Sequence, residues 1–172
     1  MIETLRKRRS IRKYQETAID SQTLEVMKEA LLRSPSSRGI NPWTFIFVDQ
    51  KELLRRLSQA KEQGAQFVKD AALAIVVCGD ETKSDVWVED CSIAAIVVQL
   101  AAQSLGLGSC WSQIRNRSHS KEKSAEKYIQ ELLHIPENLR VLSIVSIGVP
   151  AETKTPIAKE QLDYTKIHYN AY

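Results

Sequence analysis

Residues that build metal centres and disulfide frameworks are scarce in this sequence. Its 172 residues include three cysteines and three histidines, no CxxC pair occurs, and no spacing among them fits a set of metal ligands. The cysteines lie far apart in apolar stretches, so we expect buried, reduced thiols. Neither a disulfide scaffold nor a metal site is therefore expected.

The sequence also lacks the apolar segments needed for export or membrane insertion. Charged residues stand where a signal peptide has its apolar core, and no apolar stretch runs uninterrupted for about 18 residues. The hydrophobic fraction of 43% and the charged fraction of 26% are typical of a soluble globular protein. We expect a cytoplasmic protein that forms a single domain over residues 1–172 and does not bind a membrane.

The net charge is small, but its distribution is uneven. Twenty-four basic and 21 acidic residues give a formal charge of +3, which does not by itself indicate binding to nucleic acid. Six of the basic residues lie between Arg6 and Lys13. This concentration indicates that positive charge serves a local purpose near the N-terminus.

Hydrophobic periodicity and capping residues predict helices that alternate with strands, without internal repeats or linkers. A helix begins at Asp20 or Ser21 and ends before Pro35, and an Asp49–Glu52 capping box predicts another over residues 50–62. Further helices are predicted over residues 2–7 and 125–133, and strands over 43–48, 73–78, 109–114 and 141–149. The continuous apolar run at 73–78 predicts a strand that is buried on both faces. This alternation favours an α+β or α/β sandwich with a central sheet.

The segment from Asp85 to Leu105 is predicted to form a deeply buried helix. It is apolar on almost all sides between Ile93 and Ala102, and Gly106 stands where a C-cap belongs. In so small a chain, a partner subunit is the simplest source of a second covering surface. The aromatic tail, residues 162–172, shows no helical periodicity and is also expected to dock on a partner.

The first candidate site is the segment Arg8-Arg9-Ser10-Ile11-Arg12. Its guanidinium groups and its hydroxyl suit a phosphate dianion, which accepts charge-assisted, bidentate hydrogen bonds. Taken alone, the motif also fits a solvated basic terminus, or a patch that binds anionic lipid or nucleic acid.

A second candidate is the loop from Pro35 to Trp43, with the sequence PSSRGINPW. Two prolines and a glycine give an irregular backbone, serine and asparagine side chains supply hydrogen-bonding groups, and Trp43 anchors the loop. Such loops often hold polar ligands. The same residues also suit a rigid connection between a helix and a strand.

A third candidate runs from Leu105 to Gln113 (LGLGSCWSQ), out of the buried helix and into a strand. Its glycines allow close approach of the backbone, and the residues after them can line a flat apolar ligand. The alternative is that Gly106 only caps the helix and Gly108 only forms a turn. It is not a dinucleotide-binding fingerprint, because GxGxxG is absent and the glycines follow a helix.

In this order and at these spacings, the three segments resemble the nitroreductase family of flavoproteins. That family opens with R-x-S-x-R, continues with an A-P-S-x-x-N-x-Q-P-W loop, and has a long helix that ends in L-G-L-G before a Trp. Its last strand ends in I-G-x-P. The matching segments here are residues 8–12, 35–43, 105–111 and 147–150, and Trp87-Val88-Glu89-Asp90 is also similar.

The resemblance implies a three-layer α/β/α fold of the α+β class and an intertwined homodimer with two FMN molecules at its interface. Arg8 and Ser10 match positions that hold the FMN phosphate and ribityl chain, and Arg9 and Arg12 match positions near the flavin pyrimidine edge. The loop would come from the partner subunit, and the segment 111–113 would flank the ring, with a backbone N–H near flavin N5. The implied cofactor-binding set is Arg8, Arg9, Ser10, Arg12, Pro35, Ser36, Ser37, Arg38, Asn41, Trp111, Ser112 and Gln113.

The sequence departs from the family pattern at several positions. Gly39 stands where the family loop has Asn, and Asn41 stands where it has Gln. The family has a basic pair after its last strand that completes the phosphate clamp, and the candidates here are Lys154 and Lys159.

The resulting hypothesis is an FMN-dependent enzyme that reduces small acceptors, such as nitroaromatics or quinones, with NADH or NADPH in a ping-pong cycle. No side chain is expected to act as acid or base, because the flavin carries the hydride chemistry. Arg115 and Arg117 either face the cofactor mouth, where they attract NADPH phosphates, or form a solvated turn. The alternatives are a flavin-storing or flavin-sensing protein without turnover, and a basic arm that binds nucleic acid or membrane.

Overall fold

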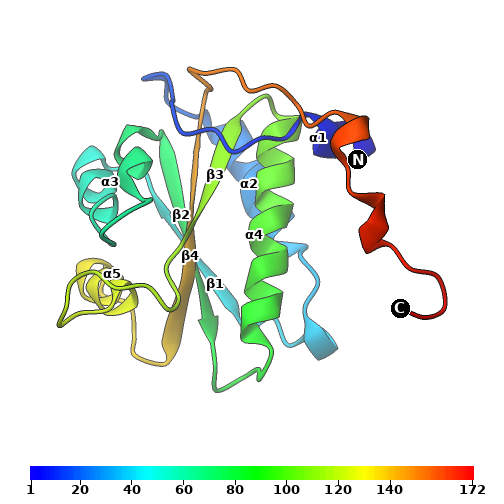
Figure 1. The fold of residues 1–172 in the computed structure, drawn as a ribbon. Helices are drawn as coiled ribbons and strands as arrows, with labels where there is room; N and C mark the ends of the chain where they lie inside the picture. The colour runs from blue at the N-terminus through cyan, green and yellow to red at the C-terminus, as the bar shows by residue number, and fades with distance from the viewer.

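The computed structural model describes the whole chain, residues 1–172, as five α-helices and four β-strands (Figure 1). Every helix and strand predicted from the sequence is present, and only α3 ends more than two residues from its predicted bound. The helices are α1 (Ile2–Lys7), α2 (Ser21–Leu32), α3 (Lys51–Leu57), α4 (Trp87–Ser104) and α5 (Ala125–Leu133). The strands are β1 (Trp43–Val48), β2 (Leu73–Asp80), β3 (Gly108–Gln113) and β4 (Leu139–Gly148).

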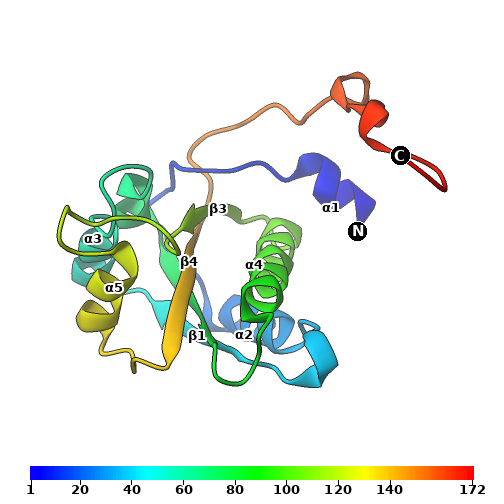
Figure 2. The same ribbon diagram turned by 60° about the horizontal axis from the view of Figure 1, so that its bottom comes forward.

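The strands form one antiparallel sheet in the order β1-β2-β4-β3, so that β1 and β3 are its edges. Helices α3 and α5 cover one face, and α2 and α4 cover the other (Figures 1 and 2). Every residue of β2 is buried, which confirms the prediction of a strand covered on both faces. The predicted three-layer α/β/α architecture is therefore confirmed.

Alternating side chains of β2 divide the hydrophobic core into two parts. Val76 belongs to a cluster of 16 buried residues beneath α3 and α5, whereas Ile75 and Val77 belong to a cluster of 15 beneath α2 and α4. Burying one such β-branched side chain stabilises the fold by roughly 1.5–3 kcal/mol. The sheet is thus fixed between two helical layers, and its edge strand β3 has a rigid position.

Helix α4 has one face buried against the sheet and another face open. Cys91, Ala94 and Val98 are completely buried, while Ile93 and Ile96 are 39% and 38% exposed. The predicted apolar helix therefore lacks cover on one side within the single chain. None of the helices has both the length and the hydropathy that crossing a bilayer requires.

The third helix is shorter than predicted and begins without the predicted capping box. It ends at Leu57, not at residue 62, and no side chain caps its first turn. The Glu52 carboxylate pairs instead with Arg55 at 2.7 Å, and the Ser58 hydroxyl donates to the Arg55 carbonyl at 2.7 Å, in competition with helical hydrogen bonds. The chain after Ser58 therefore leaves the helix axis, which brings Lys61 to β3.

The N-terminal segment, residues 8–15, crosses the edge of the sheet beside β3 and the end of β4 (Figure 2). The Ile11 N–H donates to the Ser109 carbonyl at 3.0 Å, and the Gln15 N–H donates to the Val149 carbonyl at 2.9 Å. These hydrogen bonds fix both ends of the segment to the sheet.

Gly106 and Gly108 connect α4 to β3 and allow the N-terminal segment to approach. Gly106 has a φ of 77°, and the Leu107 N–H closes the helix end by donating to the Ala102 carbonyl at 2.8 Å. The predicted C-cap is therefore confirmed. At Gly108, Ile11 fills the space that a Cβ would occupy, 2.8 Å away.

The C-terminal tail, residues 155–172, extends away from the body of the molecule (Figure 2). All of its side chains are exposed, among them Leu162, Tyr164, Ile167 and Tyr169. Apart from two short 3₁₀ turns it has no regular structure. Its apolar side chains have no cover within the single chain.

Gly108→Ala is expected to loosen the N-terminal segment from β3. The new Cβ would lie 2.8 Å from Ile11, and overpacking of this kind costs about 1–3 kcal/mol. Urea unfolding should show a lower free energy of unfolding. Adding Ile11→Ala should relieve the clash, so that the double variant loses less stability than the two single losses combined. Strictly additive losses would contradict the close contact.

Candidate functional site

Three side chains of the N-terminal segment gather around Cys110 of β3. Burial raises the pKa of the Cys110 thiol, and the Arg12 charge, a hydrogen bond with Ser10 and the Arg8 charge act against that rise. Ser10 forms a β-bridge with Ser109, the residue before Cys110, so the segment that carries Arg8, Ser10 and Arg12 runs beside Cys110. Their two-residue spacing places them on one side of an extended segment.

Arg9 and Arg12, which the resemblance placed near one edge of the flavin, lie in different surroundings. The Arg9 guanidinium donates a hydrogen bond to the Thr155 carbonyl, where the tail begins. The Arg12 guanidinium lies over the ring of Phe67, with its central carbon 5.7 Å from the ring centre. Arg12 stays with the cluster around Cys110, whereas Arg9 joins the N-terminal segment to the tail.

Glu152, which follows β4, holds the N-terminal segment by its backbone. Its carboxylate accepts the Arg12 N–H at 2.6 Å and the Lys13 N–H at 3.3 Å, and it pairs with Lys154 at 3.4 Å. The Arg12 N–H and the Lys154 charge hold the pKa of Glu152 below its usual value. Lys154 thus reaches the cluster around Cys110, while Lys159 lies in the exposed tail.

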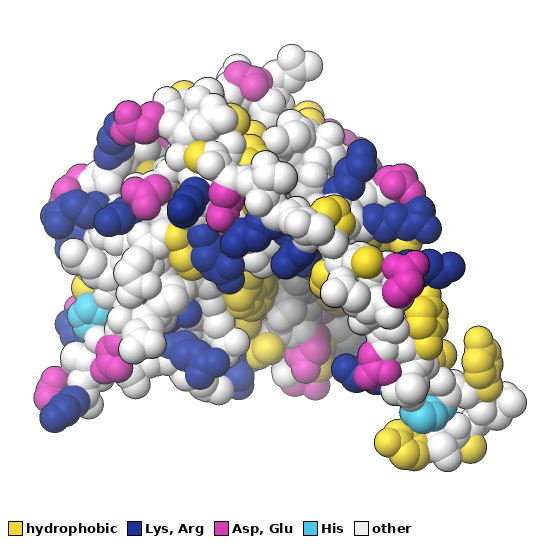
Figure 3. All heavy atoms as spheres, turned by 45° about the horizontal axis from the view of Figure 1, so that its top comes forward, with side chains coloured by type: hydrophobic (Ala, Val, Ile, Leu, Met, Phe, Trp, Pro, Cys, Tyr) yellow, Lys and Arg dark blue, Asp and Glu magenta, His cyan; other side chains and the backbone are white.

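The guanidinium groups of this cluster have no acidic partner. Arg8, Arg9 and Arg12 form no ion pair, whereas Arg6 in the preceding helix pairs with Glu3. Figure 3 shows Lys and Arg side chains gathered around a hollow in the middle of this face of the molecule. Unpaired guanidinium groups beside a hollow suit a phosphate dianion.

The outer edge of β3 presents backbone groups to the same region. The Ser109 carbonyl accepts the Ile11 N–H at 3.0 Å, and the Gln113 carbonyl accepts a hydrogen bond from Lys61 at 3.1 Å, so both face away from β4. Alternate residues of an edge strand face outward, and Trp111 lies midway between these two. Its backbone N–H and carbonyl therefore also face the free edge.

The side chains of Ser112 and Gln113 are engaged within the chain. The Ser112 hydroxyl donates to the Gly64 carbonyl at 3.0 Å, and the Gln113 amide donates to the Arg115 carbonyl at 3.0 Å. Trp111 is half-buried and packs against the cluster beneath α2 and α4. The backbone groups of this segment are therefore available to a ligand, whereas the Ser112 and Gln113 side chains are not.

Lys61 is a candidate residue that the sequence analysis missed. Its ammonium group lies against the Gln113 carbonyl and forms no ion pair. Burial lowers the pKa of Lys61, and repulsion from Arg117 lowers it further. The residue stood inside a predicted helix, and only the early end of α3 brings it to β3.

The loop from Pro35 to Trp43 is held in an unusual backbone conformation. Arg38, Gly39 and Asn41 have φ values of 55°, 66° and 53°. The Ser36 hydroxyl locks the loop, because it accepts the Asn41 N–H at 2.8 Å and donates to the Asn41 side-chain oxygen at 2.6 Å. A left-handed conformation at a non-glycine residue costs on the order of 1–3 kcal/mol, and such strain concentrates at binding sites.

Two carboxylates near the start of α4 tie this loop to the helix. Asp90 accepts the Ser37 N–H at 2.7 Å, and Asp85 pairs with the Arg38 guanidinium at 2.5 Å. Asp90 lies in the first turn of α4 and also positions the loop.

The loop and the N-terminal segment lie at opposite ends of α4 (Figure 1). This helix has 18 residues and is therefore about 27 Å long at 1.5 Å per residue. The loop contacts its first turn, whereas the N-terminal segment lies beside β3, which follows its last turn. One chain does not bring the two predicted halves of the cofactor site together.

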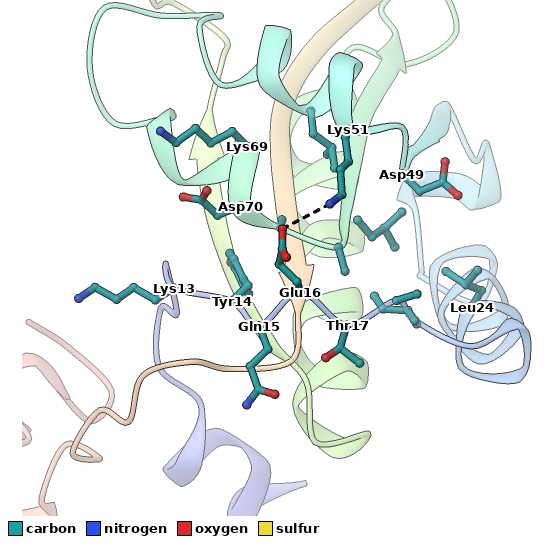
Figure 4. A pocket seen from close by; sticks show the side chains of 16 residues that line it. Lys13, Tyr14, Gln15, Glu16, Thr17, Leu24, Asp49, Lys51, Lys69 and Asp70 are labelled. Atoms are coloured by element: carbon teal, nitrogen blue, oxygen red, sulfur yellow. Dashed lines mark hydrogen bonds and ion pairs between the residues drawn. The ribbon is translucent and has the colours of Figure 1, made fainter.

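A cavity of about 590 Å³ lies beside the N-terminal segment and contains none of the predicted site residues. Lys51 and Glu16 pair across it at 3.3 Å (Figure 4). Its charged lining is balanced, with three lysines and three acids: Lys13, Lys51, Lys69, Glu16, Asp49 and Asp70. A balanced lining does not favour an anion, whereas the guanidinium groups near Cys110 have no acidic partner.

The remaining reactive residue types show no separate site. No group of three or more histidine, cysteine and acidic side chains is arranged to hold a metal ion. All three cysteines are buried and unpaired, as predicted, and burial raises the pKa of Cys78 and Cys91 to about 12. These two thiols stay protonated at neutral pH and are not nucleophiles.

Glu152→Ala is expected to destabilise the protein at neutral pH but not in acid. The folded-state pKa of Glu152 lies below the usual value of 4.5, so its contribution is complete above pH 4.5 and is lost as the pH falls through the folded-state value. The difference in Tm between wild type and variant should shrink between pH 7 and pH 3. Glu160→Ala, in the exposed tail, is the matched control. An undiminished difference at pH 3 would contradict a charge-based role.

Comparisons with known proteins identify the family of the chain. The sequence profile of the Nitroreductase family matches residues 5–75 and 59–149. Proteins described as NADH dehydrogenase/NAD(P)H nitroreductase from Archaeoglobus fulgidus and Methanothermobacter thermautotrophicus are 40% identical over 151 residues and 36% identical over 171 residues. These alignments cover 86% and 98% of this chain and 83% and 85% of the two proteins.

A solved structure extends the likeness to the whole fold. The FMN-dependent nitroreductase from Clostridium difficile superposes with a TM-score of 0.98 and 47% sequence identity, over 100% of both chains. The profile match and the two relatives independently cover most of the chain. The chain therefore belongs to the nitroreductase family.

Proposed function

We propose that this protein is an FMN-dependent NAD(P)H oxidoreductase that reduces small organic acceptors. Its family relatives include an FMN-dependent nitroreductase and NAD(P)H nitroreductases. The single observation that carries the proposal is that the free edge of β3 is bordered by the segment that carries Arg8 and Arg12 and by the Lys61 ammonium group, none of which has an acidic partner.

The phosphate end of FMN is assigned to the cluster around Cys110. Arg8 and Arg12 supply guanidinium groups, Ser10 supplies a hydroxyl, and Lys154 adds a fourth polar group. The Glu152 carboxylate accepts hydrogen bonds from backbone N–H groups and does not pair with the guanidinium groups. It therefore fixes the segment and leaves the Arg8 and Arg12 guanidinium groups free. A phosphate dianion matches this charge and this set of donors.

The ring end of FMN is assigned to the free edge of β3. When bound there, FMN would supply the hydride chemistry between NAD(P)H and the acceptor. The outward N–H of Trp111 gives a fixed donor for the ring, and Lys61 gives positive charge beside it. A cation at this place stabilises the negative charge that develops on the pyrimidine edge during reduction.

The loop from Pro35 to Trp43 is assigned to the FMN site of a partner subunit. Within one chain it lies about the length of α4 from the Cys110 cluster, about 27 Å. The open face of α4 at Ile93 and Ile96 and the exposed tail offer the apolar surface that a second copy would cover. A twofold homodimer gives each site one N-terminal segment and one loop.

One site against the flavin has to admit NAD(P)H and then the acceptor, which favours a ping-pong cycle. Flat acceptors such as nitroarenes and quinones fit this requirement. The cysteines and histidines form no catalytic group at the Trp111 edge, so the chain binds and orients the reactants and contributes charge.

The enzyme cycle is tested by stopped-flow absorbance under argon. The purified protein should be yellow, NADH or NADPH should bleach it, and a nitroarene or a quinone should restore the colour. Bound FMN that neither nicotinamide reduces would reject the enzyme and favour a flavin-storing or flavin-sensing protein. Colourless protein that refuses added FMN would reject flavin binding altogether.

Arg8→Ala combined with Ser10→Ala should raise the Kd for FMN about 100-fold or more, because hydrogen bonds to a charged phosphate are lost. Fluorescence quenching of added FMN measures this. Arg6→Ala, two residues before Arg8 and paired with Glu3 on the surface, should change the Kd by no more than about twofold. Equal effects of the two changes would contradict a specific phosphate site.

A further inference from the structure

Two arginines follow β3 on a backbone that the fold holds rigidly. Asn116, between Arg115 and Arg117, has a φ of 57° and forms the turn. The Arg115 N–H donates to the Leu142 carbonyl at 3.0 Å, and the Arg117 N–H donates to the Ile114 carbonyl at 3.0 Å. The Arg117 carbonyl accepts a further hydrogen bond from α5 at 2.9 Å. The two side chains therefore start from fixed positions.

Neither arginine has an acidic partner, although basic residues on the following segment do. Lys123 pairs with Glu131 at 2.7 Å, and Lys127 pairs with Glu137 at 3.3 Å. Arg115 and Arg117 form no ion pair and no side-chain hydrogen bond to protein. The two guanidinium groups are therefore free to bind an anion.

The turn adjoins the ring end of the proposed FMN site. Lys61 lies on the outer edge of β3, where its ammonium group donates to the Gln113 carbonyl, and the Arg117 charge lowers the pKa of Lys61. The Gln113 amide also holds the Arg115 carbonyl at 3.0 Å. Arg115 follows two residues after the end of β3 at Gln113, on the side of Trp111 that lies away from Ser109. Cations thus continue past the flavin ring, away from the phosphate cluster.

We propose that Arg115 and Arg117 form the subsite for the 2′-phosphate of NADPH and make the enzyme prefer NADPH to NADH. This inference rests on the proposed function of the same site. When the nicotinamide lies on the ring beside Trp111, the adenosine end has to lie farther out. Two neighbouring guanidinium groups bind a phosphate dianion far more strongly than a hydroxyl. NADPH carries that phosphate at the ribose 2′ position, where NADH carries a hydroxyl.

Arg117→Ala should raise the KM for NADPH about tenfold while kcat and the KM for NADH stay unchanged. Arg115→Ala should act in the same direction, and Arg117→Lys should recover only part of the NADPH affinity because a lysine cannot form a bidentate contact. Lys121→Ala removes an exposed charge four residues farther along and is the matched control.

A binding measurement separates the phosphate subsite from general effects on turnover. By calorimetry, 2′,5′-ADP should bind the FMN-loaded protein more tightly than 5′-AMP, and Arg117→Ala should abolish this difference. Equal rises of KM for both nicotinamides would assign the arginines to the pyrophosphate that NADH and NADPH share, and would overturn the proposal. No change in either KM would identify a solvated turn and would also overturn it.

The same experiments distinguish this inference from the function on which it rests. Each variant should keep its yellow colour and its bound FMN, because the arginines lie beyond the phosphate cluster. Variants that stay yellow and turn over with both nicotinamides without discrimination would refute the NADPH subsite alone. Loss of FMN in the wild type would refute the function itself.

Discussion

The structure depends on positive charge that is held in place without being neutralised. Arg8 and Arg12 lie in a segment fixed by its backbone, through Ile11 to Ser109 and through the Arg12 N–H to Glu152. A carboxylate bound to the guanidinium groups would have cancelled the charge that a phosphate needs. The Glu152 carboxylate bonds the backbone instead, so the segment is rigid and its guanidinium groups are free to bind an anion.

The length of α4 is the reason that we propose a second copy to complete the site. The helix separates the Asp90-bound loop from the Cys110 cluster, and both are anchored by hydrogen bonds that do not let them approach each other. The same helix leaves Ile93 and Ile96 exposed. A helix that divides the two halves of a site and also carries an uncovered apolar face fits a dimer in which α4 lies near the interface.

Local signals were enough to predict most of the fold from the sequence. The β-branched run of β2, the apolar length of α4 and Gly106 each determine their own structure through burial, periodicity or a positive φ. The α3 prediction was wrong at its end, because Glu52 and Ser58 make side-chain contacts that compete with capping and with the helix. Such competition is not visible in a helical pattern.

The site was predictable only where one segment carries several of its groups. Arg8, Ser10 and Arg12, which the motif grouped together, lie on one segment beside Cys110 in the structure. Lys61 and Glu152 were missed because each joins the site through tertiary contacts, one after an early helix end and the other across the end of β4. No motif marks either residue, so only the three-dimensional fold reveals them.

The central claim is that each flavin site combines the N-terminal segment of one copy with the loop of the other. Mixing two inactive variants tests it most directly: Arg8→Ala/Ser10→Ala, and Arg38→Gly/Asn41→Gly, in which glycine tolerates the positive φ of the loop. After unfolding and refolding together, random pairing should restore about a quarter of the FMN sites, because each mixed dimer regains one intact site. A mixture that binds no more FMN than the separate variants would contradict a shared site.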